Sequence, residues 1–294
     1  MPDISPPCAG PPGADDLGPS LPVPEQRGRV WYVVGKIMLE RIGFFHFVCD
    51  HGKPLPSLIA ALSEHNEISG SPVVLPEAFN IGKPYREAGC CNFDPSVLSS
   101  LCGLSMKYQV VFVAGLIVET SGKPYPPYSS AYLIDGEGPR LMCHKMTKDG
   151  YDHRNCTPCT ANCDGENFVR NCTPCTANCD GEDPVQYGDA CIGAVICRDV
   201  DHSRFDALVQ RVKGFDSAWK ILCVPSCMSR HYFSGNTLSD LRLKGKYVVL
   251  ANSDPEGCGS FVTNTDGVKV RRAEDCHNTI DLLPLPTKTT DSPR

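Results

Sequence analysis

Three short apolar runs, each followed by one reactive side chain, constrain this chain more than any other feature. Each run is typical of a strand buried on both faces. A carboxylate, an ammonium group and a thiol at strand ends are the groups that covalent acyl transfer requires, because Glu can take the thiol proton, Cys can attack a carbonyl or nitrile carbon, and Lys can stabilise the developing charge. The runs are 73–75 before Glu77, 141–143 before Lys145, and 193–196 before Cys197.

The residues around the first run predict an α/β arrangement. Residues 44–48 have the composition of a strand, and residues 55–66 carry apolar side chains at helical spacing, so they predict an amphipathic helix before the strand 73–75. This strand–helix–strand order is typical of α/β domains. Glu77 then follows the carboxyl end of a strand, where open α/β sheets place their chemistry.

Further alternating elements follow along the chain. A helix is predicted after Cys197, where Phe205, Leu208, Val209 and Val212 recur at helical spacing. Asn264-Thr265-Asp266-Gly267 between two apolar runs predicts a hairpin. Together these patterns predict a mixed sheet with helices outside. The remaining predicted strands are 110–118, 131–134, 140–144, 221–224, 247–251, 260–263 and 268–270.

Charge and composition exclude several classes of partner. The 294 residues carry a formal net charge of -6, which gives no attraction to nucleic acid or to an anionic membrane. No apolar run approaches the length of a membrane span, and the first residues lack the basic start and apolar stretch of a secretory signal. We therefore expect a soluble, cytoplasmic protein with neither nucleic acid nor a membrane as its partner.

The 18 cysteines need a separate explanation. A dense disulfide scaffold is typical of small secreted domains, whereas this chain is long enough to bury its own core. Cys143, Cys191 and Cys223 lie within apolar runs, where cysteine behaves as a small buried hydrophobe. The cysteines therefore favour a reducing compartment.

The domain organisation follows from composition. Residues 1–28 are rich in Pro and Gly and poor in large apolar residues, so they predict a disordered tail. Residues 29–277 form one predicted domain, and from 278 the return of Pro and Thr predicts a C-terminal tail, 278–294. Within the domain, the segment 154–166 recurs unchanged at 170–182, 16 residues later. This repeat forms an insertion, 154–183, between Lys145 and Cys197.

The insertion contains the spacing Cys-x2-Cys-x3-Cys twice. Thiolates are good ligands for zinc or an iron–sulfur cluster, but this spacing is not a standard four-ligand pattern. Disulfides, or a tandem duplication without a further role, explain the same residues. We predict no cofactor and keep the metal alternative open for Cys156, Cys159, Cys163, Cys172, Cys175 and Cys179.

Across roughly residues 30–275, the three reactive segments and their order resemble the carbon–nitrogen hydrolase (nitrilase) superfamily. The family patterns are an apolar strand ending in Pro-Glu, a Lys shortly after a strand, and Ile-Cys-(aromatic or Arg)-Asp/Glu. Here they read Pro76-Glu77, Lys145 and Ile196-Cys197-Arg198-Asp199. The resemblance implies an α/β fold of four layers, an α-β-β-α sandwich, which pairs into homo-oligomers.

The resemblance also implies the roles of the site residues. Glu77 is expected as base and then acid, and Lys145, rather than the nearby Lys148, is expected to face the oxyanion. The backbone N–H of Arg198 is the second expected oxyanion donor. Relatives carry a second pocket glutamate between Lys and Cys, but Glu166 and Glu182 both lie in the repeat, and neither is assigned. The substrate-binding candidates are Phe79, Tyr85, Ser226 and Cys227.

These observations predict a Glu-Lys-Cys hydrolase that cleaves a small amide, ω-amide or N-carbamoyl compound through a thioester. Arg198-Asp199 after the nucleophile favours the amidase branch, because nitrilases usually carry Trp-Glu there; a nitrilase remains an alternative. A weakly active or inactive binding scaffold is the other alternative. It is favoured by the Cys-rich insertion and by a stretch between Cys227 and Lys246 that is short for the family.

Overall fold

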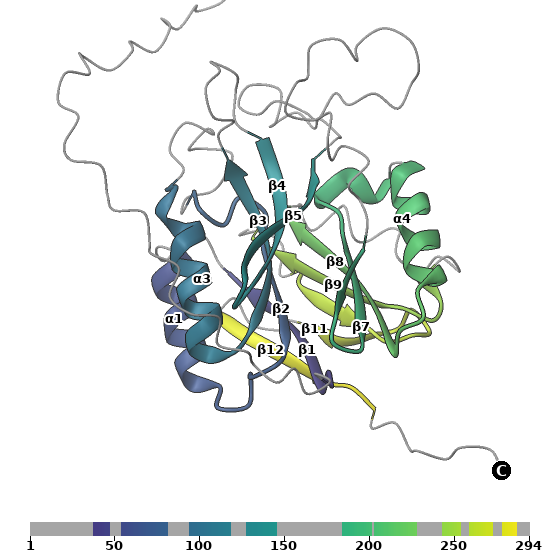
Figure 1. Ribbon diagram of the computed structural model, residues 1–294, viewed down its shortest axis with the longest axis horizontal. Helices are drawn as coiled ribbons and strands as arrows, with labels where there is room; N and C mark the ends of the chain where they lie inside the picture. Colours follow the sequence, from purple (N-terminus) through teal and green to yellow (C-terminus); the bar gives the residue numbers. More distant parts are fainter. Residues whose placement is uncertain are drawn as a thin grey trace, which may run out of the picture. The chain divides into compact units, whose positions relative to one another are not determined.

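The computed structural model describes nine segments of the chain (Figure 1). They are residues 38–47, 54–81, 94–118, 128–145, 184–201, 203–227, 243–253, 259–272 and 278–286. The predictions made for the tail 1–28, the insertion 154–183, Tyr85 and Lys148 lie outside these segments.

Six strands form the first sheet, called sheet A. Its order is β12-β1-β2-β3-β4-β5. The central strands β1, β2 and β3 are parallel, and every other neighbouring pair is antiparallel. The strands are β1 (Arg41–His46), β2 (Pro72–Leu75), β3 (Val111–Val118), β4 (Tyr128–Asp135), β5 (Gly138–His144) and β12 (Thr279–Pro284).

Sheet B has the same plan, with three parallel strands at its centre. Its order is β11-β10-β9-β8-β7-β6, and β7, β8 and β9 are parallel. The predicted hairpin around residues 264–267 joins β10 to β11. The strands are β6 (Val185–Tyr187), β7 (Ala190–Ala194), β8 (Trp219–Ser226), β9 (Tyr247–Asn252), β10 (Phe261–Thr263) and β11 (Lys269–Arg272).

Helices cover the outer faces of the two sheets (Figure 1). The helices α1 (Pro54–Glu64) and α3 (Ser96–Tyr108) pack on sheet A, and α4 (Ser203–Gly214) packs on β7 and β8 of sheet B. The inner faces meet directly, since β1 and β2 contact β9 and β3 contacts β8. This is the predicted four-layer α-β-β-α sandwich, and none of the described helices is long and apolar enough to cross a membrane.

Strand alternation divides the core between these layers. In β2, Val74 belongs to the cluster between the sheets, whereas Val73 and Leu75 pack under α1 and α3. Phe44 and Phe45 divide in the same way along β1. Because successive side chains of a strand point to opposite faces, two apolar clusters require strands that are apolar throughout.

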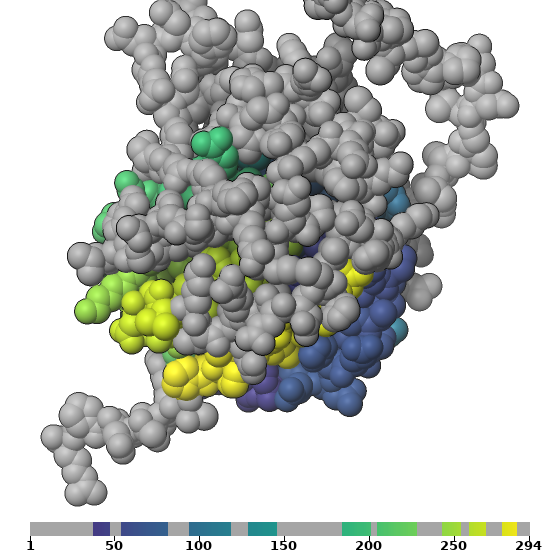
Figure 2. Space-filling view, turned by 180° about the vertical axis from the view of Figure 1, so that it is seen from behind, coloured from purple at the N-terminus to yellow at the C-terminus, as the bar shows by residue number. Residues whose placement is uncertain are grey.

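The structure corrects the predicted C-terminal tail. Residues 279–284 form β12, which pairs antiparallel with β1 along its whole length. Ile280 is buried, and Figure 2 shows the yellow β12 segment beside the blue α1 segment. Proline misled the prediction because an edge strand tolerates Pro, here Pro284 at its last position.

Two further elements differ from the sequence patterns. Helix α3 was not predicted, since its sequence mixes serines with only a few apolar residues that face the core. In β5 the predicted apolar run 141–143 has Met142 and Cys143 buried and Leu141 half-buried, whereas Pro139 and Arg140 before it are exposed. Cys143, Cys191 and Cys223 are buried, as predicted.

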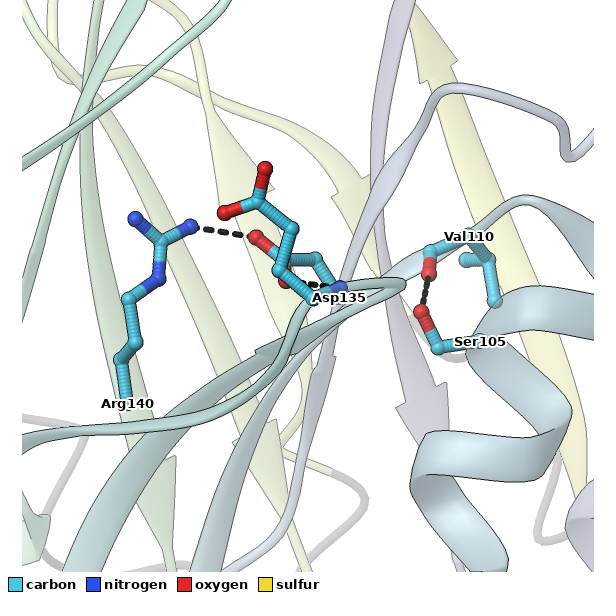
Figure 3. A network of polar contacts seen from close by, with 5 residues as sticks. Ser105, Val110, Asp135 and Arg140 are labelled. Carbon is cyan, nitrogen blue, oxygen red and sulfur yellow. Dashed lines mark hydrogen bonds and ion pairs between the residues drawn. The ribbon is translucent and has the colours of Figure 1, made fainter. Parts of the chain in front are cut away.

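The β4–β5 hairpin leads the chain to Lys145. Asp135 accepts the backbone N–H of Glu137 at 2.9 Å and forms an ion pair with Arg140 (Figure 3). Beside it, the hydroxyl of Ser105 donates to the carbonyl of Val110 and ties the end of α3 to the start of β3. Because Arg140 is part-exposed, its ion pair defines the turn more than it stabilises the fold.

Candidate active site

Glu77 lies two residues beyond β2, at the carboxyl end of the parallel strands. Its backbone N–H donates to the carbonyl of Ser226 at the end of β8, 3.3 Å away, so this segment bridges the two sheets. The next residue, Ala78, has a φ of 56°, a left-handed conformation that turns the chain sharply after Glu77. The Glu77 side chain is only 2% exposed.

Gly115 of β3 makes room for this bend. A Cβ atom at residue 115 would lie 2.7 Å from the Cα of Glu77 and 2.9 Å from the Cβ of Pro225. Neither neighbour is the end of a flexible side chain, so only glycine fits between Glu77 and β8. The predicted functional set did not include Gly115, because an isolated glycine in a strand has no distinguishing sequence pattern.

Lys145 is the first residue after β5, as predicted. Its backbone N–H donates to the carbonyl of Ser129 on β4 at 2.8 Å. Its Nζ lies 3.0 Å from Oε1 of Glu77, and both side chains are buried. The predicted carboxylate and ammonium therefore form a buried, charge-assisted hydrogen bond between β2 and β5, which are separated by two strands in sheet A.

Ser129 adds a second donor to the same carboxylate oxygen. Its hydroxyl donates to Oε1 of Glu77 at 3.1 Å, and the residue is 2% exposed. The sequence reasoning missed Ser129. The available signal was a pair of adjacent serines, Ser129 and Ser130, in an otherwise apolar strand.

Cys197 begins the short 3-10 helix η4 (Cys197–Asp201), three residues beyond β7. Its φ is 52°, in the left-handed region that residues other than glycine rarely adopt. Backbone strain of this kind persists where surrounding structure enforces it, and it occurs preferentially at active sites. The side chain is 1% exposed, so the thiol lies within the fold.

The charges of Glu77 and Lys145 both act on the Cys197 thiol. Burial raises the pKa of the Cys197 thiol well above its usual value, and the Glu77 carboxylate raises it further. The Lys145 ammonium and the backbone N–H of Cys227 act in the opposite direction. Burial and Glu77 together outweigh the lowering of this pKa by Lys145. The Cys197 side chain is therefore a protonated thiol at neutral pH.

The remaining predicted residues divide into two groups. Ser226 and Cys227 lie at the end of β8 beside the site: Ser226 accepts the Glu77 N–H, and Cys227 donates its N–H to the Cys197 sulfur. Arg198 follows Cys197 in η4 and its side chain is exposed. Phe79 packs against Phe45 and Phe47 under the sheet A helices, in a different core cluster from Cys197. That packing explains Phe79 without a role in substrate binding.

No group of three or more His, Cys, Asp and Glu side chains within the described segments is placed to hold a metal ion. The six cysteines considered for metal binding lie in the insertion, outside those segments. The described side chains that meet at this site are a thiol, a carboxylate and an ammonium group.

Comparison with solved structures identifies the fold. The chain matches an amidase from Nesterenkonia sp. with a TM-score of 0.57 and 17% identity, over 84% of this chain and 90% of the amidase. A cysteine-to-alanine mutant of the Nesterenkonia AN1 amidase, described as a member of the nitrilase superfamily, matches with a TM-score of 0.59 and 18% identity, over 84% and 91%.

A third matching structure shows that amidase with the acetamide moiety of fluoroacetamide bound covalently at its active-site cysteine (TM-score 0.56, 16% identity, 84% and 90% covered). No curated protein sequence matches the chain. A family model described as carbon-nitrogen hydrolase matches residues 59–206, just over half of the chain. This chain therefore belongs to the carbon–nitrogen hydrolase family of enzymes.

Proposed function

We propose that this protein hydrolyses a small, non-peptide amide through a thioester on Cys197. Glu77 takes the thiol proton as the sulfur attacks the amide carbon, and Lys145 stabilises the negative oxygen of the tetrahedral intermediate. Glu77 then gives the proton to the departing nitrogen, so that ammonia or an amine leaves. A water molecule, deprotonated by Glu77, attacks the thioester and releases the acid and the free thiol.

The observation that carries this proposal is the buried Glu77–Lys145 pair beside Cys197. The pair joins Nζ to Oε1 at 3.0 Å, and the charges of both residues act on the thiol. Two charges are costly to bury, and removing one of them leaves the other uncompensated. A thiol placed at a strained turn next to such a pair is an arrangement suited to nucleophilic catalysis.

The raised pKa of the Cys197 thiol is consistent with this order of steps. A thiol that is protonated in the resting state needs a base during the attack itself, and Glu77 is the carboxylate whose charge reaches it. Burial thereby keeps the proposed nucleophile in its protonated, less reactive form in the resting protein.

Two observations support an amide as the substrate class. Arg198-Asp199 follows the nucleophile, the pattern that favours amidases over nitrilases. The matching solved structures are amidases, one of them with an acetamide moiety on its cysteine. Within this class we propose ω-amides and N-carbamoyl compounds as the first candidates.

A panel of small amides, ω-amides, N-carbamoyl compounds and nitriles, assayed for ammonia release, tests the proposal. We expect release from at least one amide or carbamoyl compound, and loss of at least a thousandfold in Cys197→Ala. Cys102→Ala is the matched control, because Cys102 is a free thiol on α3. Turnover that survives in Cys197→Ala, or turnover of nitriles alone, would overturn the proposal. If no compound of the panel releases ammonia, the result would favour the alternative that this protein is a weakly active or inactive binding scaffold.

A further inference from the structure

Ser129 makes two contacts that join the acid and the ammonium of the site. Its hydroxyl donates to Oε1 of Glu77 at 3.1 Å, and its carbonyl accepts the backbone N–H of Lys145 at 2.8 Å. Lys145 in turn donates from Nζ to the same Oε1 at 3.0 Å. One residue of β4 therefore fixes both the position of the Lys145 backbone and the orientation of the Glu77 carboxylate.

The two donors occupy one oxygen of the carboxylate. An ionised carboxylate offers about two lone-pair directions on each oxygen. Oε1 of Glu77 accepts one hydrogen bond from Ser129 and one from Lys145. Protonating Oε1 would displace one of these two buried donors, so both donors favour the ionised form of the carboxylate.

We propose that Ser129 is a positioning residue for the proposed hydrolysis: together with Lys145 it orients the Glu77 carboxylate and keeps it ionised, so that it can take the Cys197 proton during attack. This inference rests on the proposed function for its kinetic consequences. The contact between the Ser129 hydroxyl and the Glu77 carboxylate stands on the geometry alone.

The alternative explanation is that the hydroxyl only satisfies a buried group and stabilises the fold. A structural role would lower stability without changing how Glu77 titrates. A positioning role changes the titration, because a hydrogen bond donated to a carboxylate favours its charged form.

Ser130 provides a matched control on the same strand. It is a buried serine like Ser129, but its side chain lies on the other face of β4, where its hydroxyl contacts Nδ1 of His144 at 2.7 Å. Ser130→Ala and Ser129→Ala therefore remove the same atom from neighbouring buried positions, and only one of the two atoms contacts Glu77.

The experiment measures kcat/KM against pH for wild type, Ser129→Ala, Ser129→Thr and Ser130→Ala. We expect Ser129→Ala to move the acid limb of the profile upward by about one pH unit, the size of a hydrogen bond to a charged group. Ser129→Thr retains a hydroxyl group, so the acid limb of its profile should lie at the wild-type pH. Ser130→Ala leaves the limb in place. An unmoved limb in Ser129→Ala, or an equal shift in Ser130→Ala, overturns the inference.

A second readout does not require turnover. The carboxyl carbon of Glu77, labelled with 13C and assigned through Glu77→Gln, is titrated by NMR in the same variants. A shift of this titration in Ser129→Ala alone supports the positioning role even if no amide is cleaved, in which case only the proposed function fails. If Ser129→Ala does not fold, Ser129→Cys replaces it and is expected to give a smaller upward shift, since a thiol is a weaker donor; no shift in Ser129→Cys then overturns the inference.

Discussion

Nζ of Lys145 lies 3.0 Å from Oε1 of Glu77, and both side chains are at least 95% buried although the residues are 68 positions apart in the chain. The pair thus connects the ends of β2 and β5 inside the fold. Its energetic consequence is asymmetric: a buried pair contributes little net stability, whereas a buried charge without its partner is strongly destabilising.

Lys145→Met should therefore cost about 3–5 kcal/mol in the free energy of unfolding, because it leaves the Glu77 carboxylate without its ammonium partner. The double variant Glu77→Gln/Lys145→Met should recover most of that loss while remaining inactive. Urea denaturation of wild type, both single variants and the double variant measures this coupling. A double variant no more stable than Lys145→Met would show that the two charges do not compensate each other.

Thiol alkylation should respond to the two charges in opposite directions. Glu77 raises the pKa of the Cys197 thiol and Lys145 lowers it. Since the thiolate is the reactive form, Glu77→Gln should be alkylated by iodoacetamide several-fold faster than wild type at pH 8, and Lys145→Met more slowly. Peptide mapping by mass spectrometry follows Cys197 separately from the half-buried Cys102 and Cys227.

In this prediction Glu77→Gln is inactive towards amides but more reactive towards an alkylating agent. The contrast separates the charge of Glu77 from its action as a proton acceptor. Equal alkylation rates in wild type and both variants would mean that neither charge reaches the thiol.

Gly115→Ala should lower both stability and activity, although Gly115 itself has no side chain that could take part in the chemistry. Its Cβ would approach the Cα of Glu77 to 2.7 Å, so the bend after β2 must move. We expect a loss of about 1–3 kcal/mol in stability from overpacking. We also expect kcat/KM to fall by about a hundredfold, because Glu77, the proposed base, is displaced.

Gly103→Ala is the control for this variant. Gly103 lies within α3, and a Cβ there would have no atom within 4 Å. Alanine is the better helix former, so this variant should gain about 0.5–1 kcal/mol with unchanged activity. Thermal denaturation and the amide assay compare the two; similar losses in both would contradict the packing argument.

The sequence predicted most of the layers because apolar periodicity reports directly on burial. Val73, Val74 and Leu75 are buried on both faces of β2, and the helical spacing after Cys197 forms α4. β12 was missed because its strand pattern is short and close to prolines, and it becomes a strand only by pairing with β1, more than 200 residues away. Long-range pairing of this kind overrides local composition.

The contact of Ser129 could not be predicted for a related reason. From the β4–β5 turn, Asp135 pairs with Gly138 and Tyr132 with Leu141, but a register shift between Ala131 and Tyr132 places Ser130 opposite His144. Regular pairing counted from the turn would place Ser129, and not Ser130, opposite His144. A single bulge thus decides which serine approaches Lys145, and no residue pattern in the hairpin indicates it.

His46 should make the fold sensitive to acid. It ends β1 and is 1% exposed; its Nδ1 lies 3.0 Å from Oγ of Ser260, and Nε2 has no hydrogen-bond partner among the residues that the structure describes. Burial lowers the pKa of His46 from 6.5 to about 4. Between these values the unfolded chain binds a proton that the folded chain does not, so the free energy of unfolding decreases as pH falls through this window, by roughly 3 kcal/mol in total.

Urea denaturation from pH 7.5 to 4.5 should show that the free energy of unfolding depends less on pH in His46→Gln than in wild type. His65→Gln, at a half-buried histidine after α1, should keep the wild-type slope. Parallel curves for wild type and His46→Gln would mean that another group carries the acid sensitivity.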